Sequence, residues 1–347
     1  MTQANESLNG KSGDAYEVVV VGGGAAGLSA GLVLGRSRRR VLVVDAGEPR
    51  NAPAAHMQGY LSRDGMPPAE LLAEGRRELA AYGVERADDR VTAVLPDGAG
   101  EFDVTLAGGR SVHARRIVVA TGLVDELPEL TGIAERWGRD VLHCPYCHGW
   151  EVRDEPFGVI ASETMGIHQA LLVTQWSKDV TLFLHTVREL PDADREKLAA
   201  AGVTVVEGEV AGLDVEDDRL VGVRLADGRG FPRSALFVDA RPAPRHELLA
   251  ALGVDMQDTP FGPYPAVDPT GRTSVPGVWA VGNATGPKVQ VIQAAAAGYQ
   301  AGVMINNELV MADIEQEAAR RRAGVFTPEA EAEVTERVLG ASRHGLR

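Results

Sequence analysis

Residues 16–27, which read YEVVVVGGGAAG, decide the fold of the first part of the chain. The valines at 18–21 suit a strand that is buried on both of its faces. The glycines that follow satisfy the pattern Gly-x-Gly-x-x-Gly, in which a strand turns directly into a helix. We expect this helix to run to about residue 35. The stretch therefore predicts an α/β fold built on a parallel sheet.

The three glycines of the pattern have different tasks. Gly22 permits the turn, Gly24 lets the backbone approach a pyrophosphate, and Gly27 lets the helix pack closely on the strand. The pyrophosphate charge would face the N-terminus of the helix. A second buried strand, residues 41–44, ends in Asp45, which can accept hydrogen bonds from a ribose hydroxyl. This context predicts a bound dinucleotide rather than a glycine-rich turn without a ligand.

A second motif, His143-Cys144-Pro145-Tyr146-Cys147-His148, holds the only two cysteines of the chain. Two thiols separated by two residues can close into a disulfide and reopen, and in such pairs one thiol often has a pKa depressed to roughly 3.5–7.5. The flanking histidines change charge near neutral pH, so a proton donor or acceptor lies beside the sulfurs. The motif is therefore a candidate for storing two electrons.

Four chemistries compete at this motif: a redox dithiol, covalent haem attachment at Cys-x-x-Cys-His, a zinc site completed by histidine, and two inert cysteines. Haem attachment takes place in an exported compartment, and residues 1–14 lack the apolar core of a secretory signal. Zinc usually takes four ligands, and there is no second cysteine pair. The motif favours a redox dithiol without a metal, in a cytoplasmic protein, where such a pair is more often catalytic than structural.

Composition limits the other function classes. A chain of 347 residues should form about two domains. Its 35 basic and 49 acidic residues give a net charge of −14, which argues against nucleic acid or an anionic membrane as a partner. The apolar run at 18–34 contains several glycines, so it reads as strand, turn and helix rather than as a membrane span.

Residues 157–185 repeat the plan of residues 16–45, with a strand, a helix and a second strand. The turn of this second unit departs from the pattern, because Ala161 and Glu163 stand at its first two glycine positions. Alanine narrows the turn, and a carboxylate repels phosphate. We therefore doubt that this unit binds NADPH, although a shifted pose of the nucleotide is an alternative.

Shorter elements fill the rest of the chain. The pattern predicts a helix at 68–82, antiparallel strands at 90–95, 101–106 and 111–113, a separate buried strand at 116–120, a linker at 241–244, and helices at 289–308 and from Thr327. The strand at 116–120 ends in Thr121 and Gly122, and a later buried strand leads to Gly282 and Asn283. Small residues at both turns would let the backbone lie against a flat ligand.

Together these motifs resemble the low-molecular-weight thioredoxin reductases, a family of FAD-containing disulfide oxidoreductases. The resemblance spans about residues 16–310 and rests on the order of its motifs. It implies two Rossmann-like domains of three layers (ββα), with the second inserted in the first. The predicted divisions are a disordered lead-in at 1–14, an FAD-binding domain at 15–125 and 245–312, an NAD(P)H-like domain with the cysteine pair at 126–244, and a charged helical tail at 313–347.

The resemblance also implies the roles of individual residues. The ADP half of FAD would lie against Gly22, Gly24, Ala25, Ala26, Gly27, Asp45 and Ala46, with Thr121 and Gly122 close by. The rest of the cofactor would lie against Gly282, Asn283, Gln290 and Val291. The family usually has Asp where this chain has Asn283, so hydrogen bonding there is altered. Cys147 would be next to the flavin, Cys144 would exchange with the substrate, and His148 and His143 would carry protons.

His148 stands where the family usually has Asp. A histidine can take a proton from a substrate thiol and return it. The form Cys-Pro-Tyr-Cys-His resembles the dithiol oxidases that close disulfides in small natural products such as gliotoxin and holomycin and return electrons from flavin to oxygen. We therefore expect an oxidase of a small-molecule dithiol. The alternatives are an NADPH-dependent reductase of a thioredoxin-like protein and a non-catalytic flavin redox sensor. The family implies a homodimer.

Overall fold

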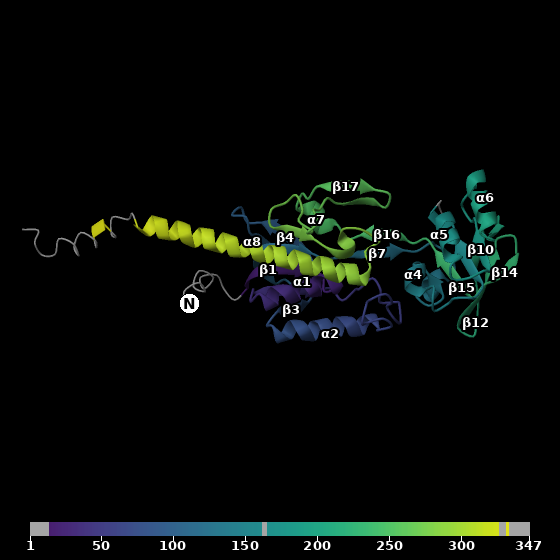
Figure 1. Ribbon diagram of the computed structural model, residues 1–347, viewed down its shortest axis with the longest axis horizontal. Helices are drawn as coiled ribbons and strands as arrows, with labels where there is room; N and C mark the ends of the chain where they lie inside the picture. The colour runs from purple at the N-terminus through teal and green to yellow at the C-terminus, as the bar shows by residue number, and fades with distance from the viewer. Residues whose placement is uncertain (1–13, 162–164, 326–330, 333–347) are drawn as a thin grey trace, which may run out of the picture.

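The computed structural model describes residues 14–161, 165–325, 331 and 332, which form two lobes (Figure 1). Strands β7 (Leu123–Glu126) and β16 (Arg241–Pro244) join the lobes. Residues 1–13 of the predicted lead-in, Glu163 of the second turn and the helix start at Thr327 lie outside the described residues.

The first lobe holds a seven-stranded sheet. Its parallel part runs in the order β3 (Glu85–Asp88), β2 (Val41–Asp45), β1 (Ala15–Val21), β6 (Ser111–Val119) and β19 (Val278–Ala280). Strands β5 (Phe102–Leu106) and β4 (Val91–Pro96) extend the sheet antiparallel to β6. Strand β1 is the central strand and is buried on both faces, as its run of valines predicts.

Strand β6 corrects one prediction. The sequence predicts separate strands at 111–113 and 116–120, but the structure has one continuous strand. Its first half pairs with β5 in antiparallel orientation, and its second half pairs with β19 in parallel orientation. The burial pattern changes midway from alternating to continuous, because only the second half has hydrophobic core on both of its faces. The strand delivers Thr121 to the carboxyl edge of the sheet.

The second lobe repeats the order of four strands of the first. Its parallel sheet runs β11 (Thr204–Val206), β10 (Val180–Phe183), β9 (Phe157–Ile160), β15 (Ala235–Val238) and β8 (Val141–Leu142). A separate antiparallel sheet consists of β12 (Val210–Glu216), β13 (Arg219–Leu225) and β14 (Gly230–Pro232). This order confirms the predicted internal repeat. All of these strands lie in sequence between β6 and β19, so the second lobe is inserted in the first.

Helices cover the sheets and complete the three layers. In the first lobe, α1 (Ala25–Arg36), α2 (Pro68–Ala81) and α8 (Val291–Val325) share one hydrophobic core with one face of the sheet. The other face of the parallel part shares a second hydrophobic core with the antiparallel extension, β4 and β5, and with α7 (Glu247–Ala251). The hairpin of β17 (Met256–Thr259) and β18 (Gly262–Pro265) follows α7 in the chain. In the second lobe, α5 (Met165–Val173) and α6 (Asp192–Ala200) cover one face. The short helices are α3 (Ile133–Arg136), α4 (Pro145–His148) and the 3₁₀ turn η1 (Gly282–Ala284).

Small residues bring α1 and α8 into close contact. A Cβ atom added at Gly298 of α8 would lie 1.9 Å from the carbonyl oxygen of Ala26 on α1. One at Gly302 would lie 2.3 Å from Cγ1 of Val33 and 3.1 Å from the carbonyl oxygen of Ala30. Only glycine fits at such distances, so these positions fix the approach of the two helices. The contact holds the N-terminal half of α8 against the dinucleotide turn.

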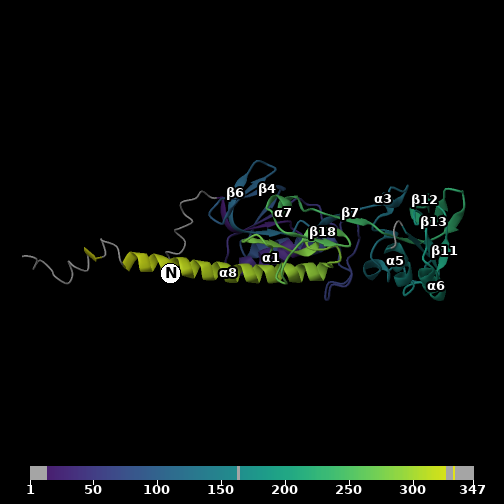
Figure 2. The ribbon, with the colours of Figure 1, turned by 90° about the horizontal axis from the view of Figure 1, so that it is seen from above.

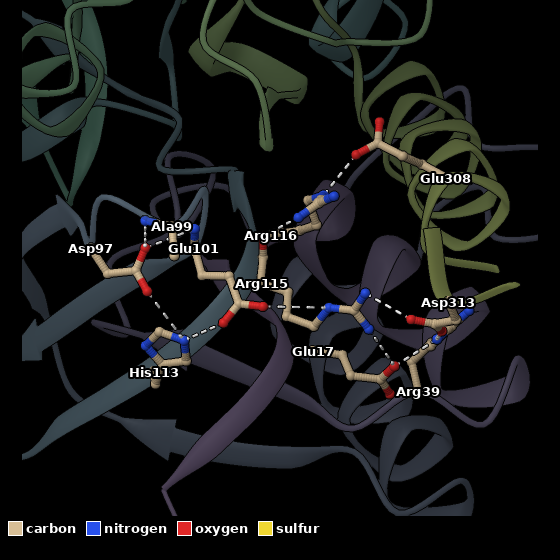
Figure 3. Close-up of polar contacts among 10 residues, drawn as sticks. All are labelled: Glu17, Arg39, Asp97, Ala99, Glu101, His113, Arg115, Arg116, Glu308 and Asp313. Atoms are coloured by element: carbon tan, nitrogen blue, oxygen red, sulfur yellow. Dashed lines mark hydrogen bonds and ion pairs between the residues drawn. The ribbon is translucent and has the colours of Figure 1, made fainter. Parts of the chain in front are cut away.

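Helix α8 is longer than the sequence predicts. The expected helix at 289–308 begins at Val291 and continues without a break to Val325, through the predicted start of a tail at 313. Asp313 accepts hydrogen bonds from Arg115 at 2.7 Å and from Arg39 at 3.0 Å, and Glu308 accepts one from Arg116 at 2.7 Å (Figure 3). These ion pairs fasten the helix to the sheet. Beyond them α8 extends past the body of the lobe (Figure 2).

The junction between the lobes corrects a further prediction. Residues 241–244, expected to be a linker, form strand β16, which pairs antiparallel with β7. Prolines at 242 and 244 are tolerated because the pair has two free edges.

Among the described residues, no helix is both long and apolar enough to cross a membrane.

Candidate active site

A cavity of about 1510 Å³ is lined by residues from both lobes. Every predicted site residue except Gly27 lines it: Gly22, Gly24, Ala25, Ala26, Asp45, Ala46, Thr121, Gly122, His143, Cys144, Cys147, His148, Gly282, Asn283, Gln290 and Val291. Gly27 faces the strand, because a Cβ atom there would lie 1.8 Å from the carbonyl oxygen of Gly22. The predicted nucleotide residues and the cysteine pair therefore share one space.

The turn between β1 and α1 fits the pyrophosphate of a dinucleotide. A Cβ atom on Gly22 would lie 2.3 Å from the carbonyl oxygen of Ala120, whereas one on Gly24 would meet no described atom within 4 Å. The backbone at Gly24 thus borders open space. Within the described chain, no side chain caps the first turn of α1. Its backbone N–H groups are free to bind an anion.

Asp45 closes the far end of this turn. A Cβ atom on Gly23 would lie 2.6 Å from the Asp45 carboxylate. Arg76 and the Gly47 N–H each donate a hydrogen bond of 3.2 Å to the same carboxylate. These two bonds hold the Asp45 side chain at the end of β2. Gly23 is a residue that the sequence pattern missed, because the Gly-x-Gly-x-x-Gly spacing leaves this position unspecified. The position of Asp45 fits an acceptor for a ribose hydroxyl.

Asn283 lines the cavity and also holds the loop beside it. Its side-chain Nδ2 donates to three carbonyl oxygens, those of Gly286 at 3.0 Å, Pro287 at 3.3 Å and Val289 at 3.1 Å. An aspartate cannot make these bonds, since its carboxylate has no donor. The amide of Asn283 therefore holds the loop that leads to α8. Its Oδ1 atom is the part left to accept from a ligand.

The cysteines lie at the start of α4. Cys144 precedes the helix, Pro145 occupies its first turn, and a disulfide joins Cys144 to Cys147. Cys147 Sγ lies 3.5 Å from Gln290 Oε1, and Cys144 Sγ lies 3.8 Å from Gln290 Nε2. Gln290 directly precedes α8 of the first lobe. The disulfide of one lobe thus contacts the wall of the other.

His148 lies in the same helical turn as the sulfurs. Neither ring nitrogen is exposed, and neither has a hydrogen-bond partner among the described residues. Burial lowers the pKa of His148 below its ordinary value of 6.5, although Glu151 acts in the opposite direction. The ring is therefore neutral near pH 7 and has a free nitrogen that can accept a proton.

His143 is tied into the fold more firmly than His148. Its ring Nδ1 lies 3.4 Å from the carbonyl oxygen of Val238, and its own carbonyl accepts a hydrogen bond from Gln169 at 2.5 Å. These contacts position the end of β8 just before Cys144. They fit a structural role at least as well as the predicted proton transfer.

Aromatic side chains stand beside the disulfide. Tyr146, between the two cysteines, is 70% exposed, and its ring meets Trp176 edge to face at 5.5 Å. Trp150 is 65% exposed, and the guanidinium of Arg153 covers its ring at 4.0 Å. Tyr146 also lines the cavity. The exposed ring of Tyr146 on the cavity wall offers a surface for an apolar or aromatic substrate.

Two ion-pair contacts at the junction were not predicted. Arg50 bonds Asp125 of β7 through two nitrogens, at 2.8 and 2.7 Å, and also donates to the carbonyl oxygen of Pro287 at 2.9 Å. Arg245 bonds Glu48 at 3.0 Å, and its carbonyl oxygen accepts from Thr121 Oγ1 at 3.0 Å. No local pattern marks these residues, because their partners are far away in sequence. They fix the walls of the cavity near the crossing strands.

The corresponding turn of the second lobe is only partly described. Ala161 N–H donates to the carbonyl oxygen of Phe183 at 3.0 Å, as Gly22 N–H does to that of Val44 at 2.8 Å. This equivalence puts the buried Leu184 where the first lobe has Asp45. The first and last glycine positions of the pattern fall in this lobe at Ala161 and Gly166, so among the described residues only the last is glycine. A Cβ atom on Gly166 would lie 2.6 Å from Cα of Ala161, which leaves no room for a side chain.

Comparison with known proteins agrees with this geometry. Residues 16–302 match the family described as pyridine nucleotide-disulphide oxidoreductase. The chain belongs to this family. The match confirms the resemblance seen in the sequence, and it makes the chain an FAD-dependent disulfide oxidoreductase of the thioredoxin reductase type.

Individual proteins are similar to this chain over most of their length. Thioredoxin reductase sirT of Leptosphaeria maculans is 31% identical over 86% of this chain and 96% of its own. The crystal structure of HlmI is 49% identical, covers 91% of this chain and 99% of that chain, and gives a TM-score of 0.86. An oxidoreductase from Agrobacterium tumefaciens is 37% identical, covers 86% and 99%, and gives 0.80. These structures confirm the fold of two Rossmann-type sheets.

Proposed function

We propose that the protein oxidises a small-molecule dithiol to a disulfide. The observation that carries this proposal is the position of the Cys144–Cys147 disulfide on the wall of the dinucleotide cavity, beside the imidazole of His148, whose buried nitrogens have no hydrogen-bond partner among the described residues. A neutral imidazole at this place can take the proton of an incoming thiol. The exposed ring of Tyr146 supports a small apolar or aromatic substrate.

In the proposed reaction His148 accepts a proton from the first substrate thiol. The substrate thiolate attacks Sγ of Cys144, the bond between the two enzyme sulfurs breaks, and Cys147 leaves as a thiolate. The second substrate thiol gives its proton to the reduced cysteine pair, and its thiolate attacks the substrate sulfur of the mixed disulfide and releases Cys144. The substrate has then lost two electrons and two protons, and the enzyme pair has gained the two electrons. His148 returns its proton to solvent.

FAD is the cofactor of the family, and the residues present fit it. Its pyrophosphate would be held by the first turn of α1, its ribose by Asp45 and its central part by Asn283 near Gly282. When bound, it supplies an acceptor for the two electrons of the reduced cysteine pair, and oxygen is the proposed final acceptor. The protein's own part is to keep the sulfurs at the cavity wall and to control their protons.

We infer further that reduced nicotinamide is not needed for turnover. In the second lobe Ala161 occupies the first glycine position and Leu184 the position of the ribose-binding acid. The second candidate function is a reductase that passes electrons from NADPH to a thioredoxin-like protein. The name thioredoxin reductase, which sirT carries, favours this reading.

The test is an anaerobic titration of the purified yellow protein. We expect dithiothreitol to bleach the flavin absorbance rapidly. NADPH at the same concentration should leave the absorbance almost unchanged. Rapid bleaching by NADPH would overturn the oxidase and favour the reductase. Failure of both reagents to bleach the flavin would favour a non-catalytic flavin sensor.

We also propose a homodimer in a cytoplasmic setting, where a cysteine pair at this spacing serves catalysis rather than stability. Support for pairing comes from exposed apolar side chains on α8, at Tyr299, Val303, Val310 and Ile314. At 100° per residue these four positions fall within one narrow stripe of the helix. Such a stripe on a long helix is a surface that a second copy would cover.

A further inference from the structure

Three side chains of the types that bind metal ions meet at the antiparallel edge of the first lobe. Asp97 follows β4, Glu101 precedes β5, and His113 lies on β6. One ligand atom of each, a carboxylate oxygen or a ring nitrogen, lies within 4.8 Å of the other two. Figure 3 shows the three side chains pointing toward one another. Only 16%, 33% and 15% of these side chains, in the same order, is exposed, so they are largely shielded from solvent.

Two of the three ligand groups are oriented by contacts outside the set. His113 Nδ1 lies 3.1 Å from the carboxylate of Asp103, which favours a proton on Nδ1 and leaves the lone pair of Nε2 facing the other two groups. Asp97 Oδ1 accepts from the N–H groups of Ala99 at 2.8 Å and Glu101 at 3.0 Å, and its Oδ2 is directed at His113. Metal sites typically have such supporting bonds, with a carboxylate behind the histidine and donors behind the ligating carboxylates.

The charge at this edge is a separate indication of a cation. Three carboxylates, those of Asp97, Glu101 and Asp103, surround one imidazole. Arg115 approaches Glu101 only to 3.8 Å, and it is shared with Asp313, to which it donates at 2.7 Å. Like charges repel more strongly where solvent is partly excluded. A divalent cation would relieve this excess of negative charge.

We propose that Asp97, Glu101 and His113 bind one divalent transition-metal ion of the zinc class, with water at the fourth position. An imidazole nitrogen with two carboxylate oxygens suits Zn²⁺, whereas Ca²⁺ takes six to eight oxygens. Ligand atoms at about 2.0–2.1 Å from one tetrahedral zinc ion lie roughly 3.3 Å apart. The Nε2 atom of His113 is 2.6 Å from Glu101 Oε2 and 3.9 Å from Asp97 Oδ2, so each carboxylate needs to move by less than about 1 Å to take the ion.

The ion would fasten the hairpin of β4 and β5 to β6, since its ligands come from all three strands or their ends. Val119, at the carboxyl end of β6, is about 20 Å from His113 at 3.3 Å per residue. The cavity begins beyond that end, at Ala120. The site is therefore a stabilising one that is separate from the sulfur chemistry, and it does not depend on the proposed function.

The test is a calorimetric titration of the oxidised holoenzyme with zinc chloride after treatment with a chelator. The closed disulfide keeps both sulfurs from binding the metal. We expect one zinc ion per chain in the wild type and loss of this binding in His113→Gln. His56→Gln, at an exposed histidine elsewhere in the first lobe, should bind zinc as the wild type does.

Two further variants separate the loss of a ligand from damage to the hairpin. Asp97→Asn keeps the Oδ1 acceptor of the turn and removes the charge, and Asp103→Asn removes the charged partner of the His113 ring. Both should weaken zinc binding, the second by about 10–100-fold. Zinc should also raise the urea midpoint of the wild type but not that of His113→Gln, because a ligand of the folded state stabilises it.

Two results would overturn the proposal. One is a wild type that binds no zinc. The other is His113→Gln binding zinc as tightly as the wild type, which would make the metal an adventitious ion held elsewhere. Neither result bears on the anaerobic titration of the cysteine pair, so a failure here is distinct from a failure of the proposed oxidase.

Discussion

At the scale of single residues, the reactivity of the site depends on what burial does to His148. Its ring is enclosed and has no partner among the described residues, so water cannot stabilise the charged form. Burial therefore lowers its pKa from 6.5. A base with a lowered pKa stays deprotonated over a wider range, and it stops working only when the pH falls below that lowered value.

We predict that the acidic limb of the profile of kcat/KM against pH lies below pH 6.5 for a dithiol substrate. His148→Asn should lower kcat/KM at pH 7 by roughly 10²-fold, in the usual range for a lost general base, and should remove the limb. His168→Asn changes an exposed histidine of the same cavity and should leave the limb in place. An unchanged limb in His148→Asn would mean that another group is the base.

At the scale of secondary-structure elements, the contact between α1 and α8 decides where the active-site loop lies. Gly298 sits against the carbonyl oxygen of Ala26, within the first turn of α1. The loop held by Asn283 directly precedes α8. A shift of α8 would therefore move Gln290 away from the sulfurs as well as open the dinucleotide turn.

We predict that Gly298→Ala lowers stability, although replacing glycine by alanine inside a helix normally stabilises by about 1 kcal/mol. Its Cβ atom would lie 1.9 Å from Ala26 O, and overpacking of this kind costs about 1–3 kcal/mol. Gly75→Ala on α2 is the control, because the nearest atom to its new Cβ, at 2.9 Å, is the flexible end of the Leu28 side chain rather than backbone. Urea unfolding of both variants measures the difference. Equal stability of the two would contradict the role given to Gly298.

Several elements were visible in the sequence and others were not, for physical reasons. The glycine turn and the repeat of residues 16–45 at 157–185 are local patterns, and the structure has both. The continuity of β6 depends on partners from distant segments, and its burial pattern changes midway. The charged residues after 312 predict a separate helical tail, but α8 runs through this boundary without a break, and Asp313 is bonded to Arg115 and Arg39.

Some residues of the candidate site could likewise be predicted from the sequence, and others could not. Residues of the nucleotide turn and the cysteine pair were identified from motifs, and they line one cavity. The contact of Gln290 with the sulfurs could not be predicted, because it joins positions 143 and 146 residues apart across two lobes. The three carbonyl bonds of Asn283 were also hidden, since a family pattern with Asp there points to a ligand rather than to the loop.

At the scale of the whole molecule, the apolar stripe of α8 is the feature that a lone copy leaves uncovered. Its four side chains, Tyr299, Val303, Val310 and Ile314, are 39–57% exposed. We predict a dimer by light scattering at micromolar concentration, and a shift to monomer in Ile314→Asp because a charge in an apolar interface is costly. Gln316→Asp adds the same charge outside the stripe and should remain dimeric. A monomeric wild type would refute the pairing.

The paired crossing strands have a consequence for protein engineering. Glu126 and Arg241 face each other across β7 and β16, and Arg241 Nε donates to Glu126 Oε2 at 2.7 Å. The inserted lobe therefore departs and returns at one point, and residues 127–240 form a cassette with adjoining ends. Recombination at these two positions would exchange the lobe that carries the cysteine pair between relatives as a single module. The host protein would keep its own first lobe, with the dinucleotide turn, intact.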